Sequence, residues 1–250
     1  MTTTPFYLNW TFWSFVVAFT ALILSQLPKM NVWFKRKKID LEIHNRITVN
    51  HWIGVPGISL FLGITNKGRA KVKIKKIELK IKKERQNIAN LTCNSFFETS
   101  VSQSPNLFFP FELLSEKSWD HSCWFTIDLD RNTEQKFRGL LSALDINVSD
   151  KIKNKTNENQ LIEADESLVK PLIEHKEKAF IWEPGEYFIE ITLLSDPPIS
   201  ISKNIRFTLF ETDTKELKAY SDDYKYGMGY HNQKNKGLNI PISEDSAQRT

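Results

Sequence analysis

The chain opens with an unbroken apolar stretch. Residues 6–27 carry no charged side chain and consist mostly of Phe, Trp, Leu, Val, Ala and Ile. As a helix they would extend roughly 33 Å at about 1.5 Å per residue, which matches one bilayer crossing. Pro28 follows and would end the helix. The pattern predicts a single transmembrane helix over residues 6–28. A buried amphipathic helix is the less favoured alternative, because no face is polar.

A basic juxtamembrane segment, residues 29–38, comes next, whereas residues 1–28 contain no Lys or Arg. Because positive charge gathers on the cytoplasmic side of a spanning helix, we expect an outside N-terminus and a cytoplasmic C-terminal domain at the cell (inner or plasma) membrane. A secretory signal peptide would have the opposite order, with its basic region first. The cations are Lys29, Lys35, Arg36, Lys37 and Lys38.

Beyond Lys38 apolar and polar residues alternate, which is typical of half-buried strands. The clearest alternation covers residues 39–50, 58–65 and 70–83, with an irregularity at His44-Asn45 and a change of phase at Lys75-Lys76. A one-residue slip would turn a strand inside out, so a β-bulge is expected at Lys75-Lys76. Further segments are predicted as strands over 106–114, 122–129, 187–193 and 205–209, a helix over 133–145 and an exposed loop over 147–160, with 161–178 ambiguous.

These segments favour a mainly β fold, an immunoglobulin-like antiparallel β-sandwich of about seven strands over residues 39–211. A helical or loop insertion is expected at about 130–178. Tyr187, in a Gly-x-Tyr sequence, is interpreted as a structural tyrosine corner. Residues 212–250 lose the apolar spacing and are predicted to be a disordered polar tail. Its tyrosines, at 220, 224, 226 and 230, could instead form a linear partner motif.

Residues 60–74, Leu-Phe-Leu-Gly-Ile-Thr-Asn-Lys-Gly-Arg-Ala-Lys-Val-Lys-Ile, carry a hairpin-type turn at Asn66-Lys67-Gly68. This run resembles the paired strands of uncharacterised bacterial membrane-anchored proteins, in which a TNxGRxxVxI hairpin recurs near the start of the domain. Those proteins join an N-terminal transmembrane helix to an immunoglobulin-like β-sandwich. The resemblance implies that fold and implies no activity.

Charge is divided unevenly along the chain. The net charge of +4 splits into +12 over residues 29–85 and −8 over the rest. The basic third should be drawn to an anionic leaflet. Lysines on the strand 70–83 could receive acidic lipid or nucleic acid, but a solvated face that discourages edge-to-edge aggregation is the favoured interpretation. This row comprises Lys71, Lys73, Lys75, Lys80 and Lys82.

Sequence signatures of catalysis are missing: no phosphate-binding glycine loop, Gly-x-Ser-x-Gly elbow, His-Glu-x-x-His or paired-cysteine metal motif occurs. Asp120-His121-Ser122 comes nearest to a catalytic set, but strand neighbours point to opposite faces. Cys93 and Cys123 are expected to be reduced, packed thiols. Carboxylates at 128, 130 and 145 could hold a cation, although a solvated turn is favoured. We therefore expect no catalytic residue, no metal and no cofactor.

Two functional hypotheses follow. The favoured one is a non-enzymatic single-pass membrane protein whose cytoplasmic β-sandwich binds a protein partner or ligand at the membrane surface. The alternative is a membrane-tethered effector, or a nucleotide-responsive or nucleic-acid-responsive component of a bacterial defence system. The expected partners are the lipid bilayer and a protein, and nucleic acid remains open as the less favoured ligand.

Overall fold

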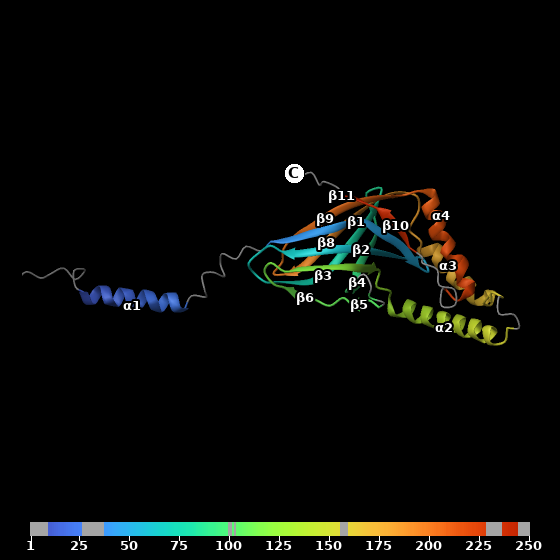
Figure 1. Cartoon of the computed structure of the whole chain (residues 1–250), viewed down its shortest axis with the longest axis horizontal. Helices are drawn as coiled ribbons and strands as arrows, with labels where there is room; N and C mark the ends of the chain where they lie inside the picture. Colours follow the sequence, from blue (N-terminus) through green and yellow to red (C-terminus); the bar gives the residue numbers. More distant parts are fainter. Residues whose placement is uncertain are drawn as a thin grey trace, which may run out of the picture.

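The computed structural model describes residues 10–26, 38–99, 102, 104–155, 160–228 and 237–244 (Figure 1). In Figure 1 the strands form one body, and the helices α2, α3 and α4 gather at one end of it. In chain order the elements are α1 (Trp10–Gln26), β1 (Ile39–Trp52), β2 (Val55–Asn66), β3 (Val72–Lys83), β4 (Gln86–Phe97), β5 (Asn106–Leu107), β6 (Phe111–Leu113), β7 (Ser118–Thr126), α2 (Arg131–Lys153), α3 (Glu166–Ala179), β8 (Gly185–Asp196), β9 (Ile201–Leu209), α4 (Glu211–Ala219), the 3-10 helix η3 (Tyr220–Tyr226), β10 (Leu238–Pro241) and β11 (Ser243–Glu244).

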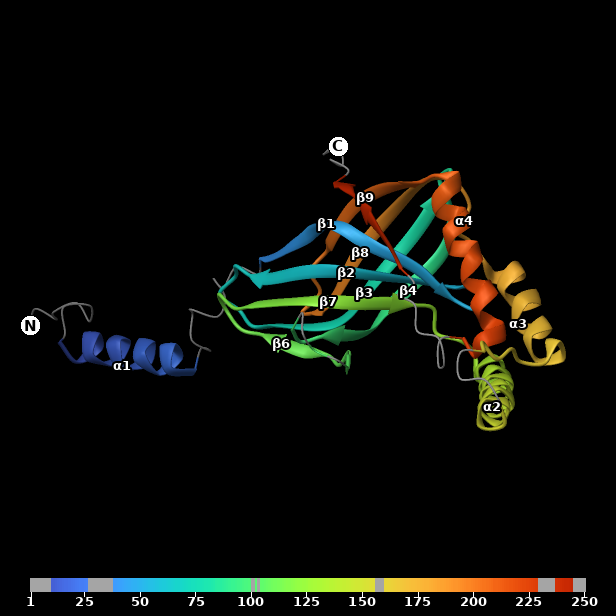
Figure 2. The same cartoon turned by 45° about the vertical axis from the view of Figure 1, so that its right-hand side comes forward.

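All the described strands belong to one antiparallel sheet. Its order is β10-β1-β2-β7-β4-β3-β8-β9-β11, with β5 paired to β4 and β6 paired to β3. Because β10 and β11 are consecutive in the chain and stand at opposite ends of this order, the sheet nearly closes into a barrel. Figure 2 shows the layering, with β1, β2 and β7 crossing over β3, β4 and β8.

The mainly β prediction is confirmed, but the two-sheet sandwich of about seven strands is replaced by this eleven-stranded sheet. Along this sheet the seven long strands run in the order β1-β2-β7-β4 and then β3-β8-β9. The two halves are joined because β3 and β4 pair as a hairpin. Glu84 and Arg85 form its turn with φ of 50° and 69°, the positive values that a tight two-residue hairpin needs. Strand β4 itself was not predicted.

Both predicted strand irregularities are confirmed. The pairing of β1 with β2 shifts between Ile43 and Ile47, around His44-Asn45. The pairing of β3 with β8 shifts between Ile74 and Lys76. The shift keeps the apolar residues of β3 buried on both sides of it, so the barrel interior stays continuous along this strand.

The turn at Asn66-Lys67-Gly68 does not join neighbouring strands, which corrects the predicted hairpin. β2 pairs with β1 and β7, whereas β3 pairs with β4, β6 and β8. Asn66 is fully buried and organises the crossing loop instead. Its Nδ2 donates to the carbonyl oxygens of Ala70 and Leu113, both at 2.9 Å, and its Oδ1 accepts from the amide of Gly68. The asparagine therefore ties two loops together at this end of the barrel.

Helices replace two segments that were predicted differently. The helix predicted over 133–145 is confirmed, but α2 continues through the first half of the predicted loop to Lys153. The ambiguous segment forms α3, with Pro171 inside it. A second apolar cluster forms where these helices meet the barrel end. It contains Ile53, Phe137, Leu144, Val169, Leu172 and Tyr224.

The predicted disordered tail is also corrected. Described residues after Thr212 form most of α4, the 3-10 helix, β10 and β11. Leu217, Tyr220 and Tyr224 are buried, because their spacing of three and four residues places them on one helical face against the barrel end. Tyr226 is partly buried, and Tyr230 lies outside the described residues. The tyrosines at 220 and 224 thus belong to the packed domain.

Candidate membrane-binding and partner-binding surfaces

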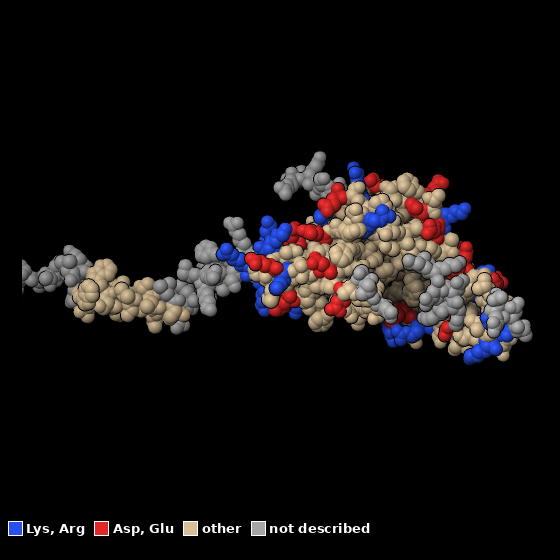
Figure 3. Space-filling view, viewed as in Figure 1, with Lys and Arg blue, Asp and Glu red and all other residues tan. Residues whose placement is uncertain are grey.

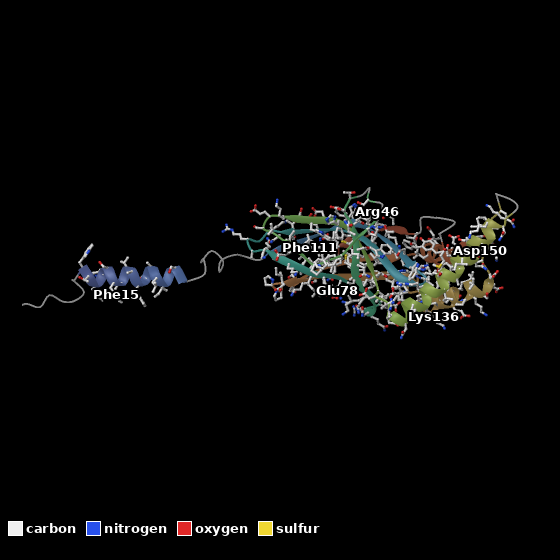
Figure 4. All side chains as sticks on the ribbon, turned by 90° about the horizontal axis from the view of Figure 1, so that it is seen from below. Phe15, Arg46, Glu78, Phe111, Lys136 and Asp150 are labelled. Atoms are coloured by element: carbon white, nitrogen blue, oxygen red, sulfur yellow. The ribbon has the colours of Figure 1, made fainter. Side chains whose placement is uncertain are left out.

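The helix α1 presents apolar side chains to solvent. It has 17 residues and no charged one, and Trp10, Phe15 and Leu22 are 84%, 68% and 59% exposed. Figure 4 labels Phe15 among the side chains of this helix. Within the described part of the chain, no helix combines the length and the apolar character that crossing a membrane requires.

The juxtamembrane cations can be placed only in part. Lys38 is exposed immediately before β1, and Lys29, Lys35, Arg36 and Lys37 lie outside the described residues. The end of the barrel where β1 begins also carries Arg69 and Lys71 in the loop between β2 and β3. In Figure 3 basic and acidic side chains are interspersed over the visible face of the barrel.

The lysine row of β3 is largely ion-paired. Lys71 contacts Glu112 at 3.0 Å, Lys75 contacts Asp196 at 3.0 Å and Lys82 contacts Glu190 at 3.0 Å. Lys73 and Lys80 are exposed, and Lys80 lies opposite Glu190 in the pairing of β3 with β8. Carboxylates from the strands on either side therefore offset much of the charge that a phosphate backbone would need.

A groove runs along the C-terminal half of α2. Its volume is about 1020 Å³, and it lies between α2 and the segment that leads into α3. Ile146 on α2 and Leu161 on the facing segment line it and are 57% and 64% exposed. Lys136 and Asp150, labelled in Figure 4, mark the two ends of α2, and the groove is at the Asp150 end.

Polar contacts fix the walls of this groove. Lys151 reaches Asp165 at 2.7 Å, and Asn147 donates to the same carboxylate at 2.8 Å. These contacts hold the pKa of Asp165 below its usual value, with the Lys151 bond as the largest cause. Glu163 is paired with Lys225 in the same way, and its pKa is also lowered. The groove thus presents exposed apolar side chains beside carboxylates that are already ion-paired with lysines.

Tyr187 has a structural position. It is fully buried, and its hydroxyl donates to the carbonyl oxygens of Glu183 at 2.6 Å and Ile181 at 2.9 Å. These are the contacts of a tyrosine corner. Desolvation by burial raises the pKa of Tyr187, so the phenol stays protonated. Trp182, which the sequence analysis did not single out, is buried beside it with ring centroids 5.6 Å apart.

The Asp120-His121-Ser122 set is not assembled as a triad. Asp120 accepts from Ser118 at 2.8 Å, and Ser122 faces the hydroxyl of Ser59 at 3.3 Å. The ring of His121 instead contacts the carbonyl oxygen of Phe97 and packs on Trp119, with ring centroids 4.6 Å apart. The three side chains have separate partners.

The carboxylate and cysteine candidates are also separated or buried. Asp130 is the N-cap of α2, because its Oδ1 accepts from the amides of Asn132 and Thr133. Over the described residues, no group of three or more His, Cys, Asp and Glu side chains could hold a metal ion. Cys93 and Cys123 are free, buried thiols. Their mutual contact and burial raise the pKa of Cys123, so this thiol stays protonated at neutral pH.

Neither the protein-family models nor the curated proteins give a match to this chain. The function is therefore argued from the surfaces themselves, because a β-barrel alone specifies no activity.

Proposed function

We propose that this protein is a non-enzymatic, membrane-anchored binding module. Residues 6–28 insert into the cell membrane, the N-terminus faces outward, and the β domain lies in the cytoplasm and binds a protein partner. The observation that carries the proposal is the apolar helix α1, whose side chains are exposed on all sides.

The energetics of α1 support insertion into lipid. Burying one large apolar side chain is worth about 1.5–3 kcal/mol, and α1 exposes several of them. The helix therefore needs a cover that no described element supplies, and the absence of any charged residue over residues 1–28 makes lipid the best match. The following cations would then lie at the cytoplasmic headgroups.

The helical end of the barrel supports the partner-binding part of the proposal. β1 begins at Ile39, near the anchor in sequence, and ends at Trp52, whose ring contacts Phe137 of α2 with centroids 5.8 Å apart. The groove with Ile146 and Leu161 thus lies at the end of the domain away from the start of β1. Exposed apolar side chains in a groove framed by polar residues are typical of protein-binding surfaces.

The ion pairs along β3 favour a protein ligand over a nucleic acid. Lys71, Lys75 and Lys82 already contact carboxylates. Nucleic-acid binding would have to break these contacts before any counterion release contributed to affinity. The defence-system alternative therefore receives no specific support from this face.

Membrane attachment is tested by fractionation of cells that express the full chain. The protein should stay in the membrane pellet after alkaline carbonate washing, and Val17→Asp in the middle of α1 should shift it toward the supernatant. A matched control, Leu194→Asp on the exposed side of β8, should stay in the pellet. Release of the unaltered protein by carbonate would contradict insertion.

Partner binding is tested by purification of the tagged full chain from its own membranes. One protein should co-purify in stoichiometric amount, and it should be lost when Ile146 and Leu161 are both replaced by Lys. Leu194→Lys changes an exposed leucine of similar size elsewhere and should retain the partner. Equal recovery of the co-purifying protein with the parent chain, the double variant and Leu194→Lys would remove the groove from the proposal.

A further inference from the structure

The two edges of the barrel face each other across a seam. On one side, β1 pairs with β2 along most of its length but offers only residues 46–49 to β10. On the other side, all nine residues of β9 pair with β8, whereas β11 pairs with only Ile205 and Arg206. Seven residues of β9 therefore have no strand partner on their second edge within the described chain.

One short segment bridges this seam. Residues 238–244, which we call the strap, form β10 against β1 and then β11 against β9. At the crossover the amide of Ile242 donates to the carbonyl oxygen of Asn45, in the irregular part of β1, at 2.9 Å. The strap is thus an added strand that pairs first with β1 and then with β9.

The strap is held by few contacts. Ile240 is its most buried residue at 8% exposure, and Pro241 has no amide hydrogen for the sheet. Leu238 and Ile242 are partly buried against the core, and the polar anchors are on the surface: Arg46 donates to Asn239, and Lys203 pairs with Glu244. By contrast, β2 shares eleven paired positions with β1. The strap therefore pairs through six positions, fewer than the long strands on either side of it, and it is easier to displace than they are.

The seam is also incompletely filled. A hollow of about 580 Å³ lies between the end of β9 and the strap, and Phe207, Ile240 and Pro241 are among its lining residues. Phe210 also lines this hollow, and its side chain is 66% exposed. A longer strand would cover the exposed ring of Phe210 and pair with more of β9 than the strap does.

We propose that the seam between β1 and β9 is a binding site for an extended peptide of a partner protein, and that the strap occupies it in cis as a stand-in. Such recognition adds a strand to an exposed sheet edge, with backbone hydrogen bonds giving affinity and alternate side chains giving specificity. This site goes beyond the groove on α2, with which it shares no lining residue.

The strap defines the chemistry of the peptide. Leu238, Ile240 and Ile242 alternate along it and pack against the barrel core. Between and beyond them, Asn239 accepts from Arg46 and Glu244 pairs with Lys203. The ligand is therefore an extended peptide with apolar residues at alternate positions and amide or carboxylate side chains on the outer face, a pattern that suits the basic Arg46, Lys203 and Arg206.

The experiment uses a fluorescently labelled peptide with the sequence of residues 237–245 and the full chain in detergent. Ile240→Asn should weaken the strap and raise the affinity for the peptide by about tenfold, since apparent affinity scales with the fraction of open seam. A disulfide between Thr48→Cys and Asn239→Cys, which replace facing residues of β1 and β10, should abolish binding until it is reduced. A scrambled peptide is the control.

The proposal would be overturned if the Ile240→Asn variant did not bind the peptide while its melting temperature stayed close to that of the parent chain. Formation of dimers by Ile240→Asn that exclude the peptide would also overturn it, because the occupant would then be a second copy. Where Ile240→Asn fails to fold, Glu244→Lys with Asn239→Ala removes only the exposed anchors, and the same two results decide the question.

Discussion

The two ends of the barrel are held together by different physical means. At the end where β1 begins, Asn66 makes three side-chain hydrogen bonds, and its backbone bonds to Glu116 and Lys117. At the other end, α2, α3 and the 3-10 helix bury a separate apolar cluster against Ile53. Hydrogen bonds to Asn66 stabilise the first end, and burial of apolar side chains stabilises the second.

This difference determines what each end can offer. A loop end fixed by hydrogen bonds has short connections and a charged surface, which suits a position beside lipid headgroups. A helical end fixed by apolar packing can present grooves, because its helices contact the barrel through one face and leave the other free. The contrast matches the division of the proposed function between anchoring and partner binding.

The largest effect should come from the helical cluster. Phe137 is 2% exposed, so Phe137→Ala should lower the free energy of unfolding by about 3–5 kcal/mol. Hydrogen exchange should rise in α2 and α3 more than in β2 and β7, which separates this cluster from the barrel. Its exposed neighbour serves as control, since Lys136→Ala should leave both measurements unchanged. Equal exchange in helices and barrel would show one indivisible core.

Asn66 tests the polar end. Asn66→Ala removes three buried side-chain hydrogen bonds and leaves the carbonyl oxygens of Ala70 and Leu113 without this donor. We expect a loss of about 2–4 kcal/mol in the free energy of unfolding, measured by denaturant titration in detergent. Lys67→Ala, one residue away on the surface, should cost much less, because its ion pair with Asp40 is exposed to solvent. A loss no greater than that of the control would remove Asn66 as the organiser of this end.

Much of the barrel was predictable because its strands alternate strictly. β3 is the clearest case, since its buried and exposed residues alternate on both sides of the shift at Lys75-Lys76. β4 was not predicted although Ala89, Leu91 and Cys93 also alternate, because the Asn, Ser and Thr residues among them resemble a loop. Its pairing with β3 joins the two halves, so the omission led to a sandwich in place of a nearly closed barrel.

The C-terminal region carried a local signal that was not recognised. Leu217, Tyr220 and Tyr224 follow helical spacing, but the charged residues between them suggested a disordered tail. The groove on α2 and the seam had no comparable signal. The groove depends on packing between α2 and residues 160–168, and the seam depends on the pairing of β1 and β9 with the strap. The seam joins segments far apart in sequence, and the groove depends on how the chain folds back after α2, and local periodicity reports neither.

Acid should weaken the helical end through His175. Its ring packs edge-on against Phe137 with centroids 4.5 Å apart, and burial, followed by Lys136 and Lys178, lowers its pKa below 6.5. The unfolded chain then binds more protons, so this contribution is complete above pH 6.5 and is lost as the pH falls toward the folded pKa. His175→Gln should reduce the loss of stability between pH 7 and pH 5. The measurement is the difference between the melting temperatures at these two pH values, compared between the variant and the parent chain.

The smallest effect should come from the lysine row that runs along β3 between the two ends. Lys82 and Glu190 are each about one-third exposed, so Lys82→Glu should lower the free energy of unfolding by only about 0.5–1 kcal/mol. Adding Glu190→Lys restores an opposite-charge pair and should recover most of that loss. A failure of the double variant to recover would mean that the lysine acts through something other than this pair. Co-purification of the partner should be the same for the single variant, the double variant and the parent chain, because this pair lies on the barrel wall outside the groove on α2.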